Sequence, residues 1–65
     1  MVIIAYDRNG SVYYDYGNRH GILVASNATF VSVSGNFIVY RTNNRTYKAE
    51  VDKNGYICRS GILVG

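Results

Sequence analysis

Short runs rich in apolar residues follow one another along the chain and end at glycine or asparagine. Val, Ile, Tyr, Thr and Phe dominate these runs, and the helical spacing i, i+3, i+4, i+7 is not sustained beyond one turn. Short runs of β-branched and aromatic residues bounded by turn residues are typical of β-strands. The pattern predicts an all-β fold without helix, a small antiparallel barrel or sandwich built from hairpins. We expect about six or seven short strands, at residues 2–6, 11–16, 22–26, 29–34, 37–42, 45–51 and 56–64.

Two tight turns in the middle of the chain set the register of three expected strands. Gly35-Asn36 and Asn43-Asn44 each suit a two-residue hairpin loop, because glycine and asparagine accept positive φ. Both turns sort the same apolar side chains onto one face, which we expect to be core: Val31, Val33, Ile38, Tyr40, Tyr47 and Ala49. The opposite face should be mostly solvated and carries Phe30, Ser32, Val39, Arg41, Thr46, Lys48 and Glu50.

The first expected hairpin turns at Arg8-Asn9-Gly10, which we interpret as a three-residue loop with a glycine bulge. This loop length predicts that Asp7 pairs with Ser11. It places on one apolar face Val2, Ile4 and Tyr6 of the first strand with Val12, Tyr14 and Tyr16 of the second. Tyr13 and Asp15 then lie on the other face with Ile3 and Ala5.

The tetrapeptide Gly-Ile-Leu-Val occurs twice, at residues 21–24 and 61–64, each time downstream of an Asp-basic-Asn-Gly turn. Three consecutive apolar side chains cannot all face one core, because strand side chains alternate. Both faces of these strands are therefore covered within the domain, or one face meets another chain. One arrangement that satisfies this condition is a small barrel whose first and last strands pair. The other is an intersubunit sheet or an exchange of strands between subunits. The candidate self-association residues are Ile22, Leu23, Val24, Ile62, Leu63 and Val64.

A chain of 65 residues corresponds to one domain, residues 1–65. Apolar burial should supply on the order of 95 kcal/mol, and ordering the chain costs about the same at roughly 1.5 kcal/mol per residue. Small domains correct this balance with disulfides, metals or oligomerisation. Cys58 is the only cysteine, and the few potential metal ligands lack paired spacing, so we expect no metal and no other cofactor. Oligomerisation remains, most simply as a homodimer.

Catalytic chemistry has little support in these residues, and we expect a protein that is not an enzyme. His20 is the only histidine and is expected in an exposed loop, while Cys58 is expected in a strand. Asp7 and Asp52 precede turns and are expected to cap local backbone N–H groups. The two remaining acids, at positions 15 and 50, show no paired carboxylate geometry. The first functional hypothesis is therefore a non-enzymatic module that acts through self-association and protein interaction.

Single-stranded nucleic acid is the alternative partner. Small β-barrels bind single strands by stacking bases on aromatic rings beside basic groups. The net charge of +3 permits an anionic partner. The candidate nucleic-acid face consists of Phe30, Arg41, Lys48 and Tyr13. The absence of a long apolar run and of a secretory signal predicts no membrane partner and a cytoplasmic location.

Overall fold

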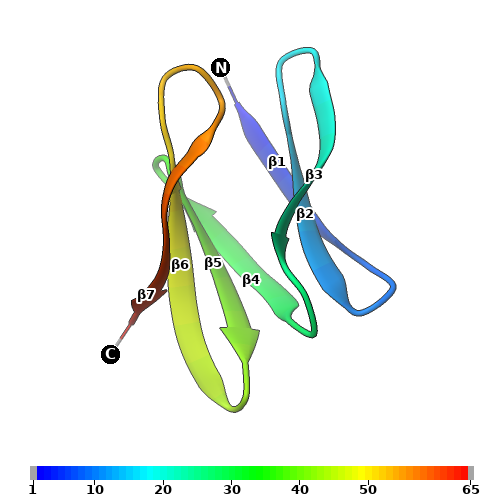
Figure 1. Cartoon of the computed structure of the whole chain (residues 1–65), viewed down its shortest axis with the longest axis vertical. Coiled ribbons are helices and arrows are strands. Elements are labelled where there is room, and N and C mark those ends of the chain that lie inside the picture. Colours follow the sequence, from blue (N-terminus) through cyan, green and yellow to red (C-terminus); the bar gives the residue numbers. More distant parts are fainter. Residues whose placement is uncertain (1, 65) are drawn as a thin grey trace.

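The computed structural model describes residues 2–64, which form seven antiparallel strands and no helix (Figure 1). The strands are β1 (Ile3–Arg8), β2 (Ser11–Tyr16), β3 (Arg19–Ala25), β4 (Thr29–Ser34), β5 (Phe37–Thr42), β6 (Arg45–Val51) and β7 (Ile57–Leu63). One sheet has the order β1-β2-β3 and the other has the order β4-β5-β6-β7. The predicted all-β, hairpin-built fold is confirmed. The largest difference in strand bounds is at β3, which begins at Arg19 instead of residue 22.

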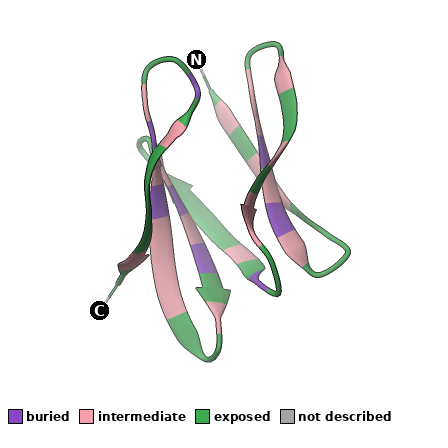
Figure 2. Ribbon diagram, in the orientation of Figure 1, coloured by how far each residue is buried: buried purple, intermediate pink, exposed green. Residues whose placement is uncertain are grey.

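The two sheets pack against each other, and buried residues from strands of both sheets (Figure 2) form one hydrophobic core between them. The core consists of Val12, Tyr14, Ala28, Ile38, Tyr40, Ala49 and Val51. Within residues 2–64, β1 pairs with β2 alone and β7 pairs with β6 alone. The expected pairing of first and last strands is therefore wrong. The sheets are not closed into a barrel, and the sandwich is the predicted architecture that fits.

Contacts between β1 and β4 close one long side of the sandwich. The backbone N–H of Ala28 donates to the carbonyl oxygen of Gly10 at 3.0 Å. The N–H of Phe30 donates to Oδ1 of Asp7 at 2.8 Å. Asp7 thus links the two sheets, and its predicted role as a cap of its own turn is wrong.

The turn between β6 and β7 packs against the three-stranded sheet. The hydroxyl of Tyr14 donates to the carbonyl oxygen of Gly55 at 2.6 Å, and Nη1 of Arg19 donates to the same oxygen at 3.0 Å. The Arg19 guanidinium also lies 3.8 Å from the ring centroid of Tyr56. Oδ1 of Asp52 accepts two backbone N–H groups of its own turn at 2.9 and 3.0 Å, which confirms its predicted capping role.

The first hairpin has a shorter loop than expected. Asn9 and Gly10 both adopt positive φ, at 51° and 78°, and form a two-residue turn. Losing one loop residue shifts β1 by one position, and in a sheet such a shift exchanges the two faces. Ile3 and Ala5 therefore pack on the core. The predicted inward face of Val2, Ile4 and Tyr6 is wrong, whereas that of β2 is confirmed.

A bulge in β4 changes the predicted partner of Tyr40. The expected partner, Val31, is the extra residue of the bulge and is 51% exposed. Phe30 pairs with Tyr40 instead and packs against the core, so its predicted place on the solvated face is wrong. Between the turn and the bulge the expected register holds, with Val33 opposite Ile38, although Val33 is 37% exposed and is not part of the buried core. The predicted register of β5 with β6 is confirmed along its length.

Candidate functional site

Both copies of the Gly-Ile-Leu-Val sequence lie on edge strands. β3 is an outermost strand of one sheet, and β7 is an outermost strand of the other (Figure 1). Leu23 and Leu63 are 49% and 55% exposed. Val64 is exposed as well, whereas Ile22, Val24 and Ile62 are half-buried. An edge strand presents unpaired backbone N–H and C=O groups that can pair with another chain.

A bulge of the same form precedes the apolar residues in both edge strands. In β3, residues 20 and 21 together oppose the single residue 15, between the pairs Tyr14↔Ile22 and Tyr16↔Arg19. In β7, residues 60 and 61 oppose the single residue 49 in the same way. Gly21 and Gly61 supply positive φ at 64° and 66°, a conformation that glycine adopts without strain. Gly21 and Gly61 therefore have the same structural role: each allows the positive φ of the bulge in its edge strand.

The two edges turn their leucines to opposite faces of their sheets. Ile22 lies opposite the buried Tyr14, so Leu23 points to the outer face of its sheet. Leu63 lies opposite Tyr47, a residue that packs on the core, and thus points to the inner face. The open side of the sandwich consequently carries exposed apolar groups on both faces, as the sequence predicts for these segments.

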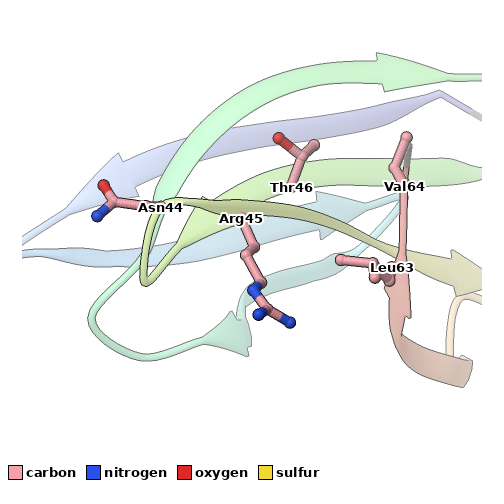
Figure 3. A pocket seen from close by; sticks show the side chains of 5 residues that line it. All are labelled: Asn44, Arg45, Thr46, Leu63 and Val64. Atoms are coloured by element: carbon pink, nitrogen blue, oxygen red, sulfur yellow. The ribbon is translucent and has the colours of Figure 1, made fainter.

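A shallow groove of about 360 Å³ runs beside the end of β7 (Figure 3). Its walls are Asn44, Arg45, Thr46, Leu63 and Val64. The N–H of Val64 donates to the carbonyl oxygen of Thr46 at 2.8 Å, so the chain stays bound to β6 up to this point. Because N–H groups alternate in direction along a strand, the N–H of Leu63 points away from β6.

Asp15 anchors the bulge of β3. Its Oδ1 accepts the Gly21 N–H at 2.8 Å and the Tyr6 hydroxyl at 3.0 Å, and its Oδ2 lies 3.6 Å from Nδ1 of His20. The hydrogen bond from Gly21 is the main cause that lowers the pKa of Asp15, and it outweighs the raising effect of partial desolvation. His20 is exposed as predicted, but it lies within β3 and not in a loop.

Acidification should weaken the protein through Asp15. A carboxyl group whose pKa is lower in the folded state stabilises the fold above its ordinary pKa of 3.8. That contribution is lost as the pH falls from 3.8 through the lowered value. Asp15→Asn should therefore reduce the dependence on pH of the free energy of unfolding, measured by urea denaturation between neutral pH and this acidic range. Because Gly21 supplies the main effect, His20→Ala should keep most of the wild-type slope, and an unchanged slope in Asp15→Asn would contradict this assignment.

The structure brings together only part of the predicted nucleic-acid face. Arg41 on β5 and Lys48 on β6 share the outer face of the four-stranded sheet. Phe30 is half-buried and packs against the core. Tyr13 belongs to the other sheet, where its ring stacks on Tyr6 with centroids 6.2 Å apart.

Phe37 is the aromatic residue of this outer face that sequence reasoning missed. Nζ of Lys48 lies 4.5 Å from the centroid of the Phe37 ring, within cation–π range. The alternation that turns Ile38 into the core turns its neighbour outward, and this signal is present in the sequence. Arg59 extends the same face and forms a partly exposed ion pair with Glu50 at 3.6 Å.

The residues considered for catalysis belong to separate sheets. His20 contacts Asp15 on the three-stranded sheet. Cys58 is an exposed free thiol on β7, with Sγ 3.5 Å from the carbonyl oxygen of Glu50. Within residues 2–64, no group of three or more His, Cys, Asp or Glu side chains is placed to hold a metal ion. The same part of the chain contains no helix long and apolar enough to cross a membrane.

Comparison with protein-family models, with curated proteins and with solved structures finds no match to this chain. The geometry of the two edge strands, and of the outer face of the four-stranded sheet, is thus the basis for functional inference.

Proposed function

We propose that this chain is a small non-enzymatic β module that acts through self-association and protein interaction, with β3 and β7 as its contact strands. The observation that carries this proposal is the position of both Gly-Ile-Leu-Val copies on open sheet edges with exposed leucines. Exposed edges with apolar side chains invite uncontrolled pairing. A defined partner on these edges would remove that hazard.

The size of the chain supports the same proposal. The folded surface of 4226 Å² is close to the roughly 4,200 Å² expected for a monomeric domain of this mass. Such a small domain gains little net free energy from its own core. Association adds stability by mass action, and a twofold dimer is the commonest closed assembly. The exposed free thiol of Cys58 is compatible with the cytoplasm, where thiols stay reduced.

The test is the charge substitution Leu63→Asp. A carboxylate at the edge of β7 should abolish self-association and lower the melting temperature, because folding and association are linked. Light scattering should show wild-type dimers and Leu63→Asp monomers. Val31→Asp is the matched control, since Val31 has nearly the same exposure but lies on β4, on the closed side. This control should remain a dimer.

Dilution provides an independent reading of the same proposal. The wild-type melting temperature should fall on hundredfold dilution, whereas that of Leu63→Asp should stay constant. A wild-type protein of monomer mass at every concentration, with a constant melting temperature, would contradict self-association.

A second candidate function is weak binding of single-stranded nucleic acid. The specific observation is the outer face of the four-stranded sheet, where Nζ of Lys48 lies over the Phe37 ring and Arg41 lies further along the same face of β5. Ring stacking beside basic groups is the usual way to bind single strands. Arg41→Glu combined with Lys48→Glu should abolish oligonucleotide binding, which should also weaken steeply with salt. Fluorescence anisotropy at low salt checks this, and unchanged affinity in the double variant would exclude this face.

A further inference from the structure

We infer that the second copy pairs like strand with like strand: β3 with its own counterpart and β7 with its own counterpart, both antiparallel, about one twofold axis. This inference rests on the proposed self-association and specifies its geometry. The resulting dimer would extend each sheet across the axis, giving one sheet of two β1-β2-β3 units and one of two β4-β5-β6-β7 units. Four observations lead to this arrangement.

The first observation is that both contact edges lie on the same side of the sandwich. β1 and β4 meet on the closed side, through the Ala28–Gly10 and Phe30–Asp7 hydrogen bonds. β3 and β7 are at the opposite edges of the two sheets. Figure 1 shows both of them in front and shows β1 and β4 as the more distant strands. A second copy approaching from the front therefore meets both edges at once.

The second observation is that β3 and β7 run in the same direction. The end of β1 lies beside the start of β4, through Asp7 and Phe30, so β1 and β4 are antiparallel. The start of β1 at Ile3 borders the same cavity as Gly35, which follows the end of β4. β3 is parallel to β1, and β7 is antiparallel to β4, because each successive pair in both sheets is antiparallel. Their arrows accordingly point the same way in Figure 1.

These two facts decide how a twofold axis can act. One possible twofold axis crosses the front of the sandwich, perpendicular to the strands. This axis reverses the strand direction in the second copy and places each sheet edge beside the same edge of the second copy. It pairs both edges antiparallel in a single contact. An axis along the strands keeps their direction and would pair β3 with β7 in parallel. Antiparallel ladders are somewhat more stable per residue, so the first axis is favoured.

The third observation concerns charge along the two edges. In both strands the basic residue, Arg19 or Arg59, precedes the bulge, and the apolar residues follow it. Pairing centred on Leu23 and Leu63 keeps each arginine about 26 Å from its counterpart, at about 3.3 Å per residue. Pairing centred on the bulges would bring each arginine to about 10 Å from its counterpart, which is less favourable because like charges near each other across a ladder repel.

The fourth observation is that the edge of β7 at Leu63 carries what an antiparallel partner needs. The N–H of Leu63 points away from β6, because the neighbouring Val64 N–H donates to Thr46. Leu63 also lines the groove beside the end of β7 (Figure 3). The same segment of a second copy would supply both the backbone acceptor and the apolar side chain to fill this space.

Single-cysteine cross-linking tests this geometry. Two variants are made in a Cys58→Ser background, Leu23→Cys and Leu63→Cys, and each is treated with a short bismaleimide at concentrations where the wild type is dimeric. Each variant alone should convert mostly to covalent dimer. In a mixture with one variant isotopically labelled, mass spectrometry should find links between identical positions and almost none between positions 23 and 63.

The outcomes separate the inference from the proposed function. Links formed only in the mixture, between positions 23 and 63, would overturn like-with-like pairing and leave self-association intact. Links at only one of the two positions would overturn simultaneous pairing of both edges. A wild-type protein that is monomeric by light scattering would overturn the proposed function itself.

Wild-type protein offers a second reading in case either leucine variant fails to assemble. A spin label on the native Cys58 should report one distance of about 33 Å, since five residues at about 3.3 Å lie on each side of an axis at Leu63. A distance much shorter than this would place the axis near the middle of β7 and overturn the leucine-centred register. The absence of any defined distance in a dimeric sample would overturn β7 pairing altogether.

Discussion

Replacing Gly55 by alanine should destabilise the protein by about 3 kcal/mol. Gly55 adopts a φ of 86°, a conformation that costs a non-glycine residue about 1–3 kcal/mol. An added Cβ would also lie 2.7 Å from Cδ1 of Tyr16, inside the contact distance, and overpacking of this kind costs about 1–3 kcal/mol. At about 4–8 °C per kcal/mol, the melting temperature should fall by about 15 °C.

Gly35→Ala is the matched control for this substitution. Gly35 has positive φ as well, at 61°, but its added Cβ would meet no atom within 4 Å. It should therefore lose only the conformational part, about 1 kcal/mol. Thermal and urea unfolding of both variants would separate the two causes. Equal losses in the two variants would show that the contact with Tyr16 has no energetic consequence.

Turn chemistry made much of this fold predictable from sequence. Gly35-Asn36 and Asn43-Asn44 each specify a two-residue loop. The register of β5 with β6, and with β4 as far as the bulge at Val31, follows from counting outward. Because side chains alternate, that register alone places Ile38, Tyr40 and Ala49 in the core, where they lie. Local sequence was sufficient here since both turns give the same answer.

The two errors of register arise where local sequence allows more than one loop or pairing. Asn9-Gly10 can end a three-residue loop or form a two-residue loop, and both satisfy the same turn preferences. The bulge at Val31 is accompanied by a contact distant in sequence, the hydrogen bond from the Phe30 N–H to Asp7. The pattern of apolar residues within β4 does not predict that contact. The same bulge turns Phe30 inward and takes it out of the predicted nucleic-acid face.

For the candidate contact strands β3 and β7, too, the sequence predicts some features and not others. Three consecutive apolar residues predict that a strand has apolar side chains on both of its faces. The exposed Leu23 and Leu63 agree with this prediction. The sequence does not report that both segments are sheet edges on one side of the molecule. That arrangement depends on how β1 and β4 meet, through contacts between residues far apart along the chain.

Tyr14→Ala should remove most of the stability of the fold. Tyr14 has no exposed surface and is the largest fully buried side chain between the two sheets. Its hydroxyl donates to the carbonyl oxygen of Gly55, so the ring and the hydrogen bond together join β2 to the β6–β7 turn. Truncating a buried aromatic side chain costs about 3–5 kcal/mol. A domain of this length has a total of roughly 3–10 kcal/mol, so a large unfolded fraction is expected even without urea.

Two further variants divide this loss between packing and hydrogen bonding. Tyr14→Phe keeps the ring and should cost only about 1 kcal/mol, because Arg19 still donates to the Gly55 oxygen at 3.0 Å. Tyr56→Ala removes a tyrosine ring that is 56% exposed and lies over the Arg19 guanidinium, and an exposed cation–π contact is worth about 0.5–1 kcal/mol. The urea midpoint of Tyr14→Ala should therefore lie far below the midpoints of Tyr14→Phe and Tyr56→Ala. A Tyr14→Ala midpoint no lower than that of Tyr56→Ala would mean that the two sheets do not depend on this side chain for their packing.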